Sequence, residues 1–248
     1  MYVSLMFHCI DMPSSLVHSN ISADFFHRIL KLLKDKNLTV ATLEESIKKE
    51  REDSSYKGVN LTFDDGWQSD YSVALPSLLR YGYKGDFFIT TDWIGKKGYL
   101  TKEQLRELDK EGMKIGSHSH THPFLATLDS KDIYEELKKS KEILEDILGH
   151  KTDSFSIPGG IYDKRVLDIA KEIGFEYICS SRPYLNNKED LTNRFCIHSK
   201  SEFWEIERLF DFDKRYAIKQ KLFYDARRYA KVFIGHKNYE KFRDFVIH

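Results

Sequence analysis

Two adjacent aspartates and a pair of histidines four residues apart are the side chains of this 248-residue sequence best suited to chemistry. Asp64 and Asp65 come directly after one short apolar run, and His118 and His122 follow another. Two histidines and one carboxylate leave an open position on a tetrahedral Zn²⁺, as a hydrolytic metal site requires. A second carboxylate beside the ligand can take a proton from the attacking water. The residue types therefore predict a hydrolase with one divalent metal ion, for which Zn²⁺ is the first choice.

Neither motif is specific when it is taken alone. In a chain with ten histidines, a pair at this spacing is expected by chance about 0.4 times. Adjacent aspartates usually mark a solvated turn, and a loop rich in histidine is often merely polar. A third motif, Pro158 to Gly160, also follows a strand-like run. Three motifs at the carboxyl ends of predicted strands are typical of the active end of a βα barrel.

The elements that must position these motifs alternate along the chain, as they do in parallel βα units. The strand-like apolar runs are residues 3–9, 39–43, 59–63, 85–90, 113–117, 155–158 and 177–180. Helical patterns lie between them, and we expect Ser22, Thr101 and Ser130 to cap three of these helices. This order predicts one α/β domain around a parallel sheet.

Composition narrows the class of protein. The sequence is 41% hydrophobic and 31% charged, which is typical of a folded globular enzyme and excludes a disordered chain. The net charge is zero, so no overall field favours nucleic acid. The three cysteines are too few and too scattered for a disulfide framework or a thiolate metal site.

The first ten residues are apolar but lack the Lys or Arg of a basic n-region, and Asp11 interrupts them. A buried strand explains this segment better than a signal peptide or a membrane span does. No other segment contains 18 consecutive uncharged apolar residues. We therefore expect a cytoplasmic protein without a transmembrane segment.

The last 35 residues form a compositionally distinct segment, because from Lys214 on ten Lys and Arg stand against three acids. We predict a barrel over 1–213 and a basic, helical extension over 214–248 that packs on it. A second interpretation of the basic residues is peripheral contact with an anionic membrane or a phosphorylated lipid carrier.

Three motifs, in this order, resemble those of the polysaccharide deacetylases, also called the NodB-homology domain or carbohydrate esterase family 4. They are Thr62-Phe-Asp-Asp-Gly66, His118-Ser-His-Thr-His122 and Phe155-Ser-Ile-Pro-Gly-Gly160. The resemblance extends over residues 3–200. It implies a single distorted (β/α) barrel of seven strands and a metal-dependent enzyme that removes acetyl groups from sugars.

The resemblance also implies a role for each residue of the first two motifs. Asp64 would be the catalytic base. Asp65, His118 and His122 would hold the metal ion. The middle histidine of the second motif, His120, is not expected to be a ligand.

The third motif implies an oxyanion contact and contains one departure from the family pattern. The backbone N–H of Gly159 would stabilise the tetrahedral oxyanion. The family usually has Tyr at this position, but the role needs only the main chain. The motif normally opens with an Arg that pairs with the base, and here Ser156 stands in its place.

A branch of the family that deacetylates poly-N-acetylglucosamine-type glycans also lacks this Arg, and its members begin with a strand that ends in Tyr-His. Met6-Phe7-His8 resembles that start, which implies that His8 is the general acid for the leaving amine. The alternatives are a core histidine at this position and His198 as the acid. Residues 193–197 resemble a late strand of the same branch. Its Arg194 would supply the missing charge, contact the substrate, or form an unrelated structural pair.

Two aromatic residues directly follow active-site motifs. Trp67 comes after the first motif and Tyr162 after the third. Either ring could stack on a sugar face, and either could simply pack in the core.

The leading functional prediction is an N-deacetylase that acts on an N-acetylated sugar or glycan intermediate. An O-deacetylase or a non-sugar amide hydrolase would use the same site. From another class, the chain could be a catalytically inactive carbohydrate-binding protein, although such a module needs no base beside a metal. A metallophosphoesterase fits less well, because those sites usually hold two metals and only one ligand set is visible.

Overall fold

The computed structural model describes residues 1–12, 19–187 and 191–234, the last eight of them by their backbone alone. Nine strands form one sheet in which every paired strand is parallel to its neighbour. They are β1 (Tyr2–Phe7), β2 (Thr39–Val40), β3 (Gly58–Asp65), β4 (Asp86–Ile89), β5 (Lys114–Ser117), β6 (Ser154–Ser156), β7 (Tyr177–Cys179), β8 (Leu191–Thr192) and β9 (Phe195–Cys196).

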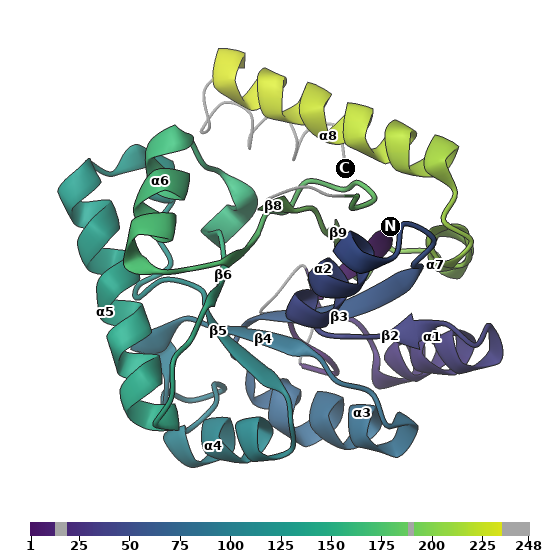
Figure 1. The fold of residues 1–248 in the computed structure, drawn as a ribbon, viewed down its shortest axis with the longest axis horizontal. Coiled ribbons are helices and arrows are strands. Elements are labelled where there is room, and N and C mark those ends of the chain that lie inside the picture. Colours follow the sequence, from purple (N-terminus) through teal and green to yellow (C-terminus); the bar gives the residue numbers. More distant parts are fainter. Residues whose placement is uncertain (13–18, 188–190, 235–248) are drawn as a thin grey trace.

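The strands follow the order β8-β7-β6-β5-β4-β3-β1-β9, and β2 pairs with the start of β3. The sheet curls into a half-barrel with helices around it (Figure 1). The predicted α/β barrel type is therefore confirmed. All seven predicted strands are present, and the short strands β8 and β9 bring the count to nine. Because both have only two residues, no apolar run of ordinary strand length marks them in the sequence, although β9 lies within residues 193–197, which resemble a late strand of the family branch.

Eight α-helices accompany the sheet within the described residues. They are α1 (Ala23–Asp35), α2 (Leu43–Glu52), α3 (Leu75–Tyr81), α4 (Lys102–Lys110), α5 (Ser130–Leu148), α6 (Lys164–Ile173), α7 (Phe203–Phe210) and α8 (Lys214–Ile234). Ser22 and Thr101 cap α1 and α4 as predicted. The prediction for α5 was wrong by one residue, because Asp129 is the cap and its carboxylate accepts from the Asp132 N–H.

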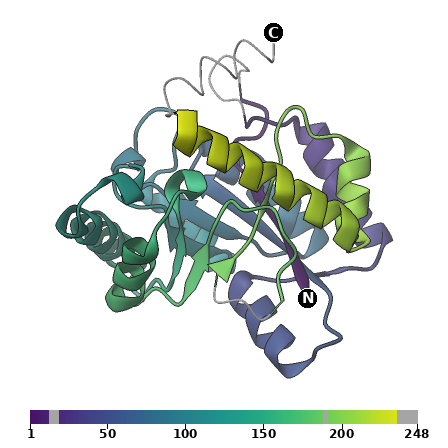
Figure 2. The same cartoon turned by 90° about the horizontal axis from the view of Figure 1, so that it is seen from above.

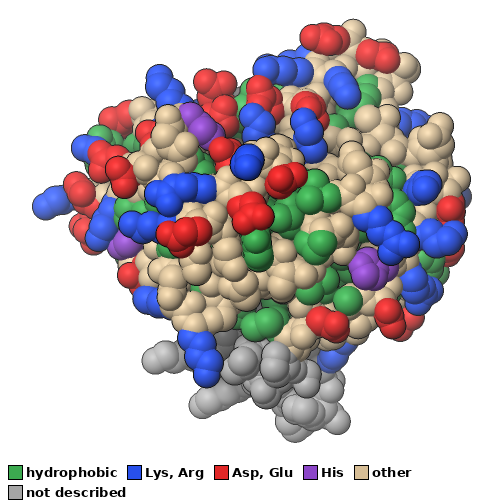
Figure 3. Space-filling view, turned by 90° about the horizontal axis from the view of Figure 1, so that it is seen from below, with side chains coloured by type: hydrophobic (Ala, Val, Ile, Leu, Met, Phe, Trp, Pro, Cys, Tyr) green, Lys and Arg blue, Asp and Glu red, His purple; other side chains and the backbone are tan. Residues whose placement is uncertain are grey.

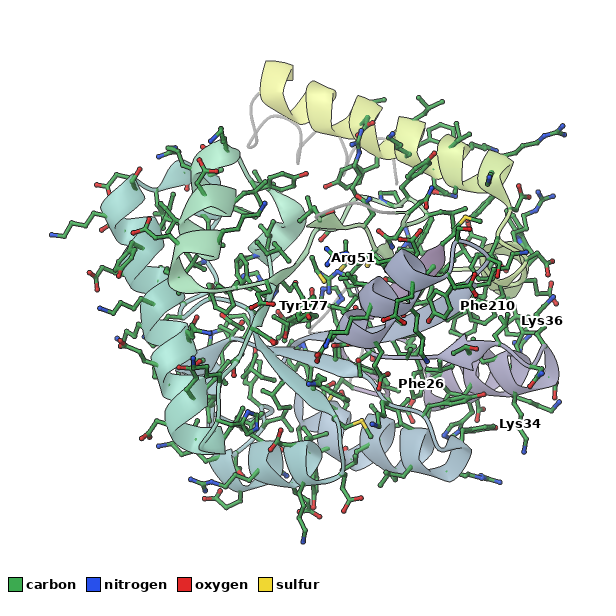
Figure 4. The ribbon with its side chains drawn as sticks, viewed as in Figure 1. Phe26, Lys34, Lys36, Arg51, Tyr177 and Phe210 are labelled. Atoms are coloured by element: carbon green, nitrogen blue, oxygen red, sulfur yellow. The ribbon has the colours of Figure 1, made fainter. Side chains whose placement is uncertain are left out.

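Aromatic rings fill the core between the sheet and α1. Phe26 of α1 is labelled in Figure 4. Its ring meets Phe7 at 5.2 Å and Phe63 at 5.9 Å between centroids, and Phe63 stacks on Phe87 at 4.5 Å. All six residues of β1 are buried. This packing fixes the strands whose carboxyl ends carry the polar motifs.

The basic C-terminal segment begins with one long helix. α8 starts beside α7 and extends toward α6 along one flank of the barrel (Figures 1 and 2), and its Tyr216 and Ala217 are buried. Residues 235–248 lie outside the described part, so the domain division at 213 stays a prediction. On the face opposite α8, acidic and basic side chains are interspersed (Figure 3). Within the described residues, no helix is both long and apolar enough to cross a membrane.

Candidate active site

The two adjacent aspartates, Asp64 and Asp65, are the last two residues of β3. Asp65 has a φ of +82°, in the left-handed region that non-glycine residues seldom adopt. Ser119 and His122, after β5, also have positive φ angles of 64° and 61°. Such conformations cost about 1–3 kcal/mol each and persist where the surroundings require them, which is common at functional sites.

The structure brings together the three predicted metal ligands. One ligand atom from each of Asp65, His118 and His122 lies within 4.8 Å of the other two. The Asp65 Oδ1 atom is 3.6 Å from Nε2 of each histidine. His120 is not part of this group, because its Nδ1 pairs with the Thr91 hydroxyl at 2.9 Å.

Hydrogen bonds behind the three ligands orient them toward one another. The Nδ1–H of His118 donates to the Ser156 carbonyl at 2.8 Å, which leaves Nε2 as the free ligand atom. Burial lowers the pKa of His118 to about 4, so its ring is neutral. The Trp67 indole N–H donates to Asp65 Oδ2 at 3.0 Å and leaves Oδ1 toward the histidines.

This donor set fits a single divalent ion. Two imidazole nitrogens and one carboxylate oxygen, each oriented by a second hydrogen bond or by packing, are typical of catalytic zinc sites with an open position. The His122 ring, for example, stacks on Trp93 at 5.4 Å. When bound, such an ion supplies Lewis acidity toward a water molecule and a carbonyl oxygen.

Arg194 pairs with the predicted base. Its guanidinium donates to both carboxylate oxygens of Asp64, at 2.7 and 2.8 Å. It also donates to the Ser156 hydroxyl at 2.7 Å, and that hydroxyl donates to Asp64 at 3.1 Å. Arg194 is completely buried. The suggestion that it contacts substrate is therefore wrong, and it instead supplies the charge that Ser156 lacks.

The pairing sets the charge of Asp64. Burial alone would raise the pKa of this carboxyl, but the Arg194 guanidinium holds it well below its usual range. Asp64 is therefore an ionised carboxylate beside the three ligands, 3.8 Å from the His118 Nε2 atom. A carboxylate in this state can accept a proton.

His8 follows β1 and lines the same cavity as Asp64 and His118. Burial opposes the protonation of its ring, but the neighbouring Cys196 and the two carboxylates at the end of β3 raise the pKa of His8 to about 9. Its buried Nδ1 atom has no hydrogen-bond partner among the described residues. His198 lines the cavity as well.

Gly159 also lines the cavity, and its conformation accounts for the missing side chain. Its φ is +62°, and a Cβ atom built on it would lie 2.6 Å from Cε1 of Phe124. The Phe124 ring thus fills the space beside Gly159 that a tyrosine would enter.

Neither aromatic residue suggested as a sugar contact lines this cavity. Trp67 stacks on Tyr99 at 4.6 Å and bonds Asp65. Tyr162 packs against a second hydrophobic cluster under α6, which includes Val166 and Phe175. Sequence reasoning missed the hydrogen bond of Trp67, for which its position two residues after Asp65 was the only signal.

The cavity is larger than the reacting groups need. It is open to solvent and has a volume of about 880 Å³, and its walls include side chains of α7 and α8 in addition to the strand ends. Sequence reasoning did not connect these helices with the site.

Comparisons with known proteins agree with the motifs. The family model described as polysaccharide deacetylase matches residues 51–178. YxkH of Bacillus subtilis is 31% identical over 181 residues, which cover 72% of this chain and 64% of YxkH. The peptidoglycan-N-acetylmuramic acid deacetylase PdaA of the same organism is 30% identical over 53% of this chain and 49% of its own. The Streptococcus pyogenes deacetylase PplD, solved with acetate, superposes with a TM-score of 0.77 at 25% identity, over 85% of this chain and 96% of that one. The chain thus spans about half to two thirds of these two curated relatives.

Proposed function

Because this chain belongs to the polysaccharide deacetylase family, we propose that it is a metal-dependent hydrolase that removes the N-acetyl group from an N-acetylated sugar or glycan intermediate. The observation that carries the proposal is the set of Asp65, His118 and His122 beside the ionised Asp64. A binding module has no use for a paired, ionised carboxylate next to a ligand set.

Each residue has one task in this reaction. Asp65, His118 and His122 hold the metal ion, and Asp64 accepts the proton of the attacking water. The Arg194 pair keeps Asp64 ionised and fixes its orientation.

Two further groups act on the substrate after the attack. The backbone N–H of Gly159 donates to the oxyanion of the tetrahedral intermediate. His8 gives its proton to the amine as the C–N bond breaks, because an unprotonated amine is a poor leaving group.

A released-acetate assay with metal analysis tests this function. We expect acetate from N-acetylglucosamine oligosaccharides, loss of activity after chelation, and its return with Zn²⁺. An O-acetylated sugar and a non-sugar acetamide are the comparison substrates. Faster release from either one would replace the N-deacetylase by an O-deacetylase or a general amide hydrolase. Absence of turnover with metal bound would favour an inactive carbohydrate-binding protein.

His8→Ala is expected to slow amide hydrolysis about 10²-fold. The same variant should lose much less on 4-nitrophenyl acetate, because an activated leaving group departs without a proton. Metal content should stay that of the wild type. The matched control is His198→Ala, because His198 is the other histidine of the cavity that does not belong to the predicted metal ligands. A selective loss on amides in His198→Ala and not in His8→Ala would move the acid to His198.

Trp67→Phe is expected to weaken metal binding about 10-fold, because it removes the N–H that holds Asp65 Oδ2. Phenylalanine keeps an aromatic face against Tyr99. Competition with a chromophoric chelator measures the dissociation constant for Zn²⁺ directly, without any activity assay. Trp93→Phe is the control, since the Trp93 ring contacts His122 by stacking. Equal effects in the two variants would show that ring packing, and not the hydrogen bond, matters.

A further inference from the structure

The active-site cavity extends to two helices beyond the matched segment 51–178. Trp204 of α7 and Phe223 of α8 line it together with Asp64 and His118. Its volume of about 880 Å³ lies near the top of the range of about 300–1,000 Å³ for small-molecule sites. One acetylated sugar ring at the metal ligands would therefore leave much of the cavity free.

Two large aromatic side chains on this wall are exposed to solvent. Trp204 is 50% exposed and Phe223 is 54% exposed. Aromatic rings that share one wall of a cavity offer apolar area to a ligand, because leaving them in water forgoes their burial. A pyranose ring presents an apolar C–H face that such a ring can cover, while its hydroxyls need donors. Two residues of the same wall carry donors. The Lys219 Nζ atom lies 5.8 Å from the centroid of the Phe223 ring, and the side-chain amide of Gln220 donates one N–H to the Tyr216 hydroxyl at 2.8 Å and has a second N–H.

The wall is fixed by contacts within the described chain. The Trp204 ring meets the buried Tyr216 edge-on at 5.8 Å, and the Tyr216 hydroxyl donates to Glu205 at 2.8 Å. Arg182 donates to both oxygens of Asp225 on α8, at 3.1 and 2.5 Å.

A second contact fixes α8 nearby. Lys221 of α8 lies over the Tyr184 ring at 4.5 Å. Arg182 and Tyr184 alternate with Ser181 and Pro183, which line the cavity. α8 is thus tied to the same loop that borders the site, so its side chains hold a defined place relative to the reacting groups.

We propose that Trp204 and Phe223 form a sugar-binding shelf that holds the glycan residue next to the one being deacetylated. This inference rests on the proposed deacetylase function and deepens it, because it makes the preferred substrate an oligosaccharide. The shelf gives α7 and α8 a role in substrate selection. Because it lies on the cavity wall and not at the ligands, it acts on binding of the longer substrate.

Trp204→Ala and Phe223→Ala, each compared with the wild type, test the shelf. Released acetate is measured from N-acetylglucosamine and from its tetramer. We expect the ratio of kcat/KM for the tetramer to that for the single sugar to fall about 10-fold in either variant. Leu222→Ala is the matched control, since Leu222 neighbours Phe223 on α8, is 63% exposed and does not line the cavity. Its ratio should equal that of the wild type. An unchanged ratio in both aromatic variants, or an equal fall in Leu222→Ala, would overturn the proposal.

A direct binding measurement distinguishes an error in the proposed shelf from an error in the proposed deacetylase function. Calorimetry with the glucosamine tetramer, which has no acetyl group to lose, reports on the shelf even if no acetate is ever released. The wild type should bind it about 10-fold more tightly than Trp204→Ala or Phe223→Ala does. No binding to the wild type would overturn the shelf. A second result would also overturn the shelf. If Trp204→Ala and Phe223→Ala bound phosphatidylglycerol vesicles more weakly than the wild type but bound the tetramer equally well, an anionic membrane would be the partner.

Discussion

Asp64→Asn is expected to lower kcat on an N-acetylated sugar by about 10³ to 10⁴ and to leave the metal content unchanged. The carboxylate is ionised beside Arg194 and accepts the proton of the attacking water, whereas an amide of the same size cannot accept it. Asparagine also presents an NH₂ group to the guanidinium, so the variant should be less stable. Activity must therefore be measured well below its unfolding temperature.

Asp65→Asn is the matched comparison, because it changes the neighbouring carboxylate in the same way. Here the metal dissociation constant should rise, and activity should return in part at high metal concentration. The Asp65 Oδ1 atom lies 3.6 Å from both histidine nitrogens, so its charge belongs to the ligand set. Equal metal loss in both variants would show that the two aspartates share one role. Unchanged kcat in Asp64→Asn would remove Asp64 as the base.

The site's location could be predicted from the sequence because parallel strands end at the same edge of a sheet. Asp64, His118 and Gly159 each come at the end of a recognisable strand. The parallel register of these strands brings their carboxyl ends close together. His8 follows β1, which pairs directly with β3, so its place near Asp64 also comes from topology.

The partner of the base could not be predicted in the same way. Arg194 lies 130 positions from Asp64 and precedes a strand of only two residues. A buried carboxylate needs a cation, but 39 Lys and Arg are available in the chain and no periodicity selects one. Only the resemblance of residues 193–197 to the family branch pointed to Arg194, and it left substrate contact and a structural pair as alternatives. The pairing of β9 with β1, together with the hydrogen bonds of Arg194 to the carbonyls of Ser180 and Arg182, places its guanidinium beside Asp64.

The directions in which side chains point could not be predicted from the sequence either. Trp67 and Tyr162 occupy similar positions after their motifs, yet one donates to a ligand and the other packs under α6. The basic composition of 214–248 indicated a helix, and α8 is one, but composition does not tell which face of a helix borders a cavity.

Arg194→Met is expected to lower the free energy of unfolding by about 3–5 kcal/mol, because it leaves the buried Asp64 without its counter-charge. Methionine fills much of the volume, so most of the loss is electrostatic. Urea unfolding followed by circular dichroism gives the value. The control is Arg208→Met, which removes the more exposed pair of Arg208 with Asp213. That loss should be within about 1 kcal/mol.

The double variant Arg194→Met with Asp64→Asn then isolates the pair itself. With both charges removed, no unpaired ion remains in the core, so the double variant should be more stable than Arg194→Met alone by about 1–3 kcal/mol. Its activity should be no higher than that of Asp64→Asn, since the base is absent in both. If the two single losses simply added, the interaction energy would be near zero. Arg194 would then stabilise the barrel through its bonds to Ser180 and Thr62 and not through Asp64.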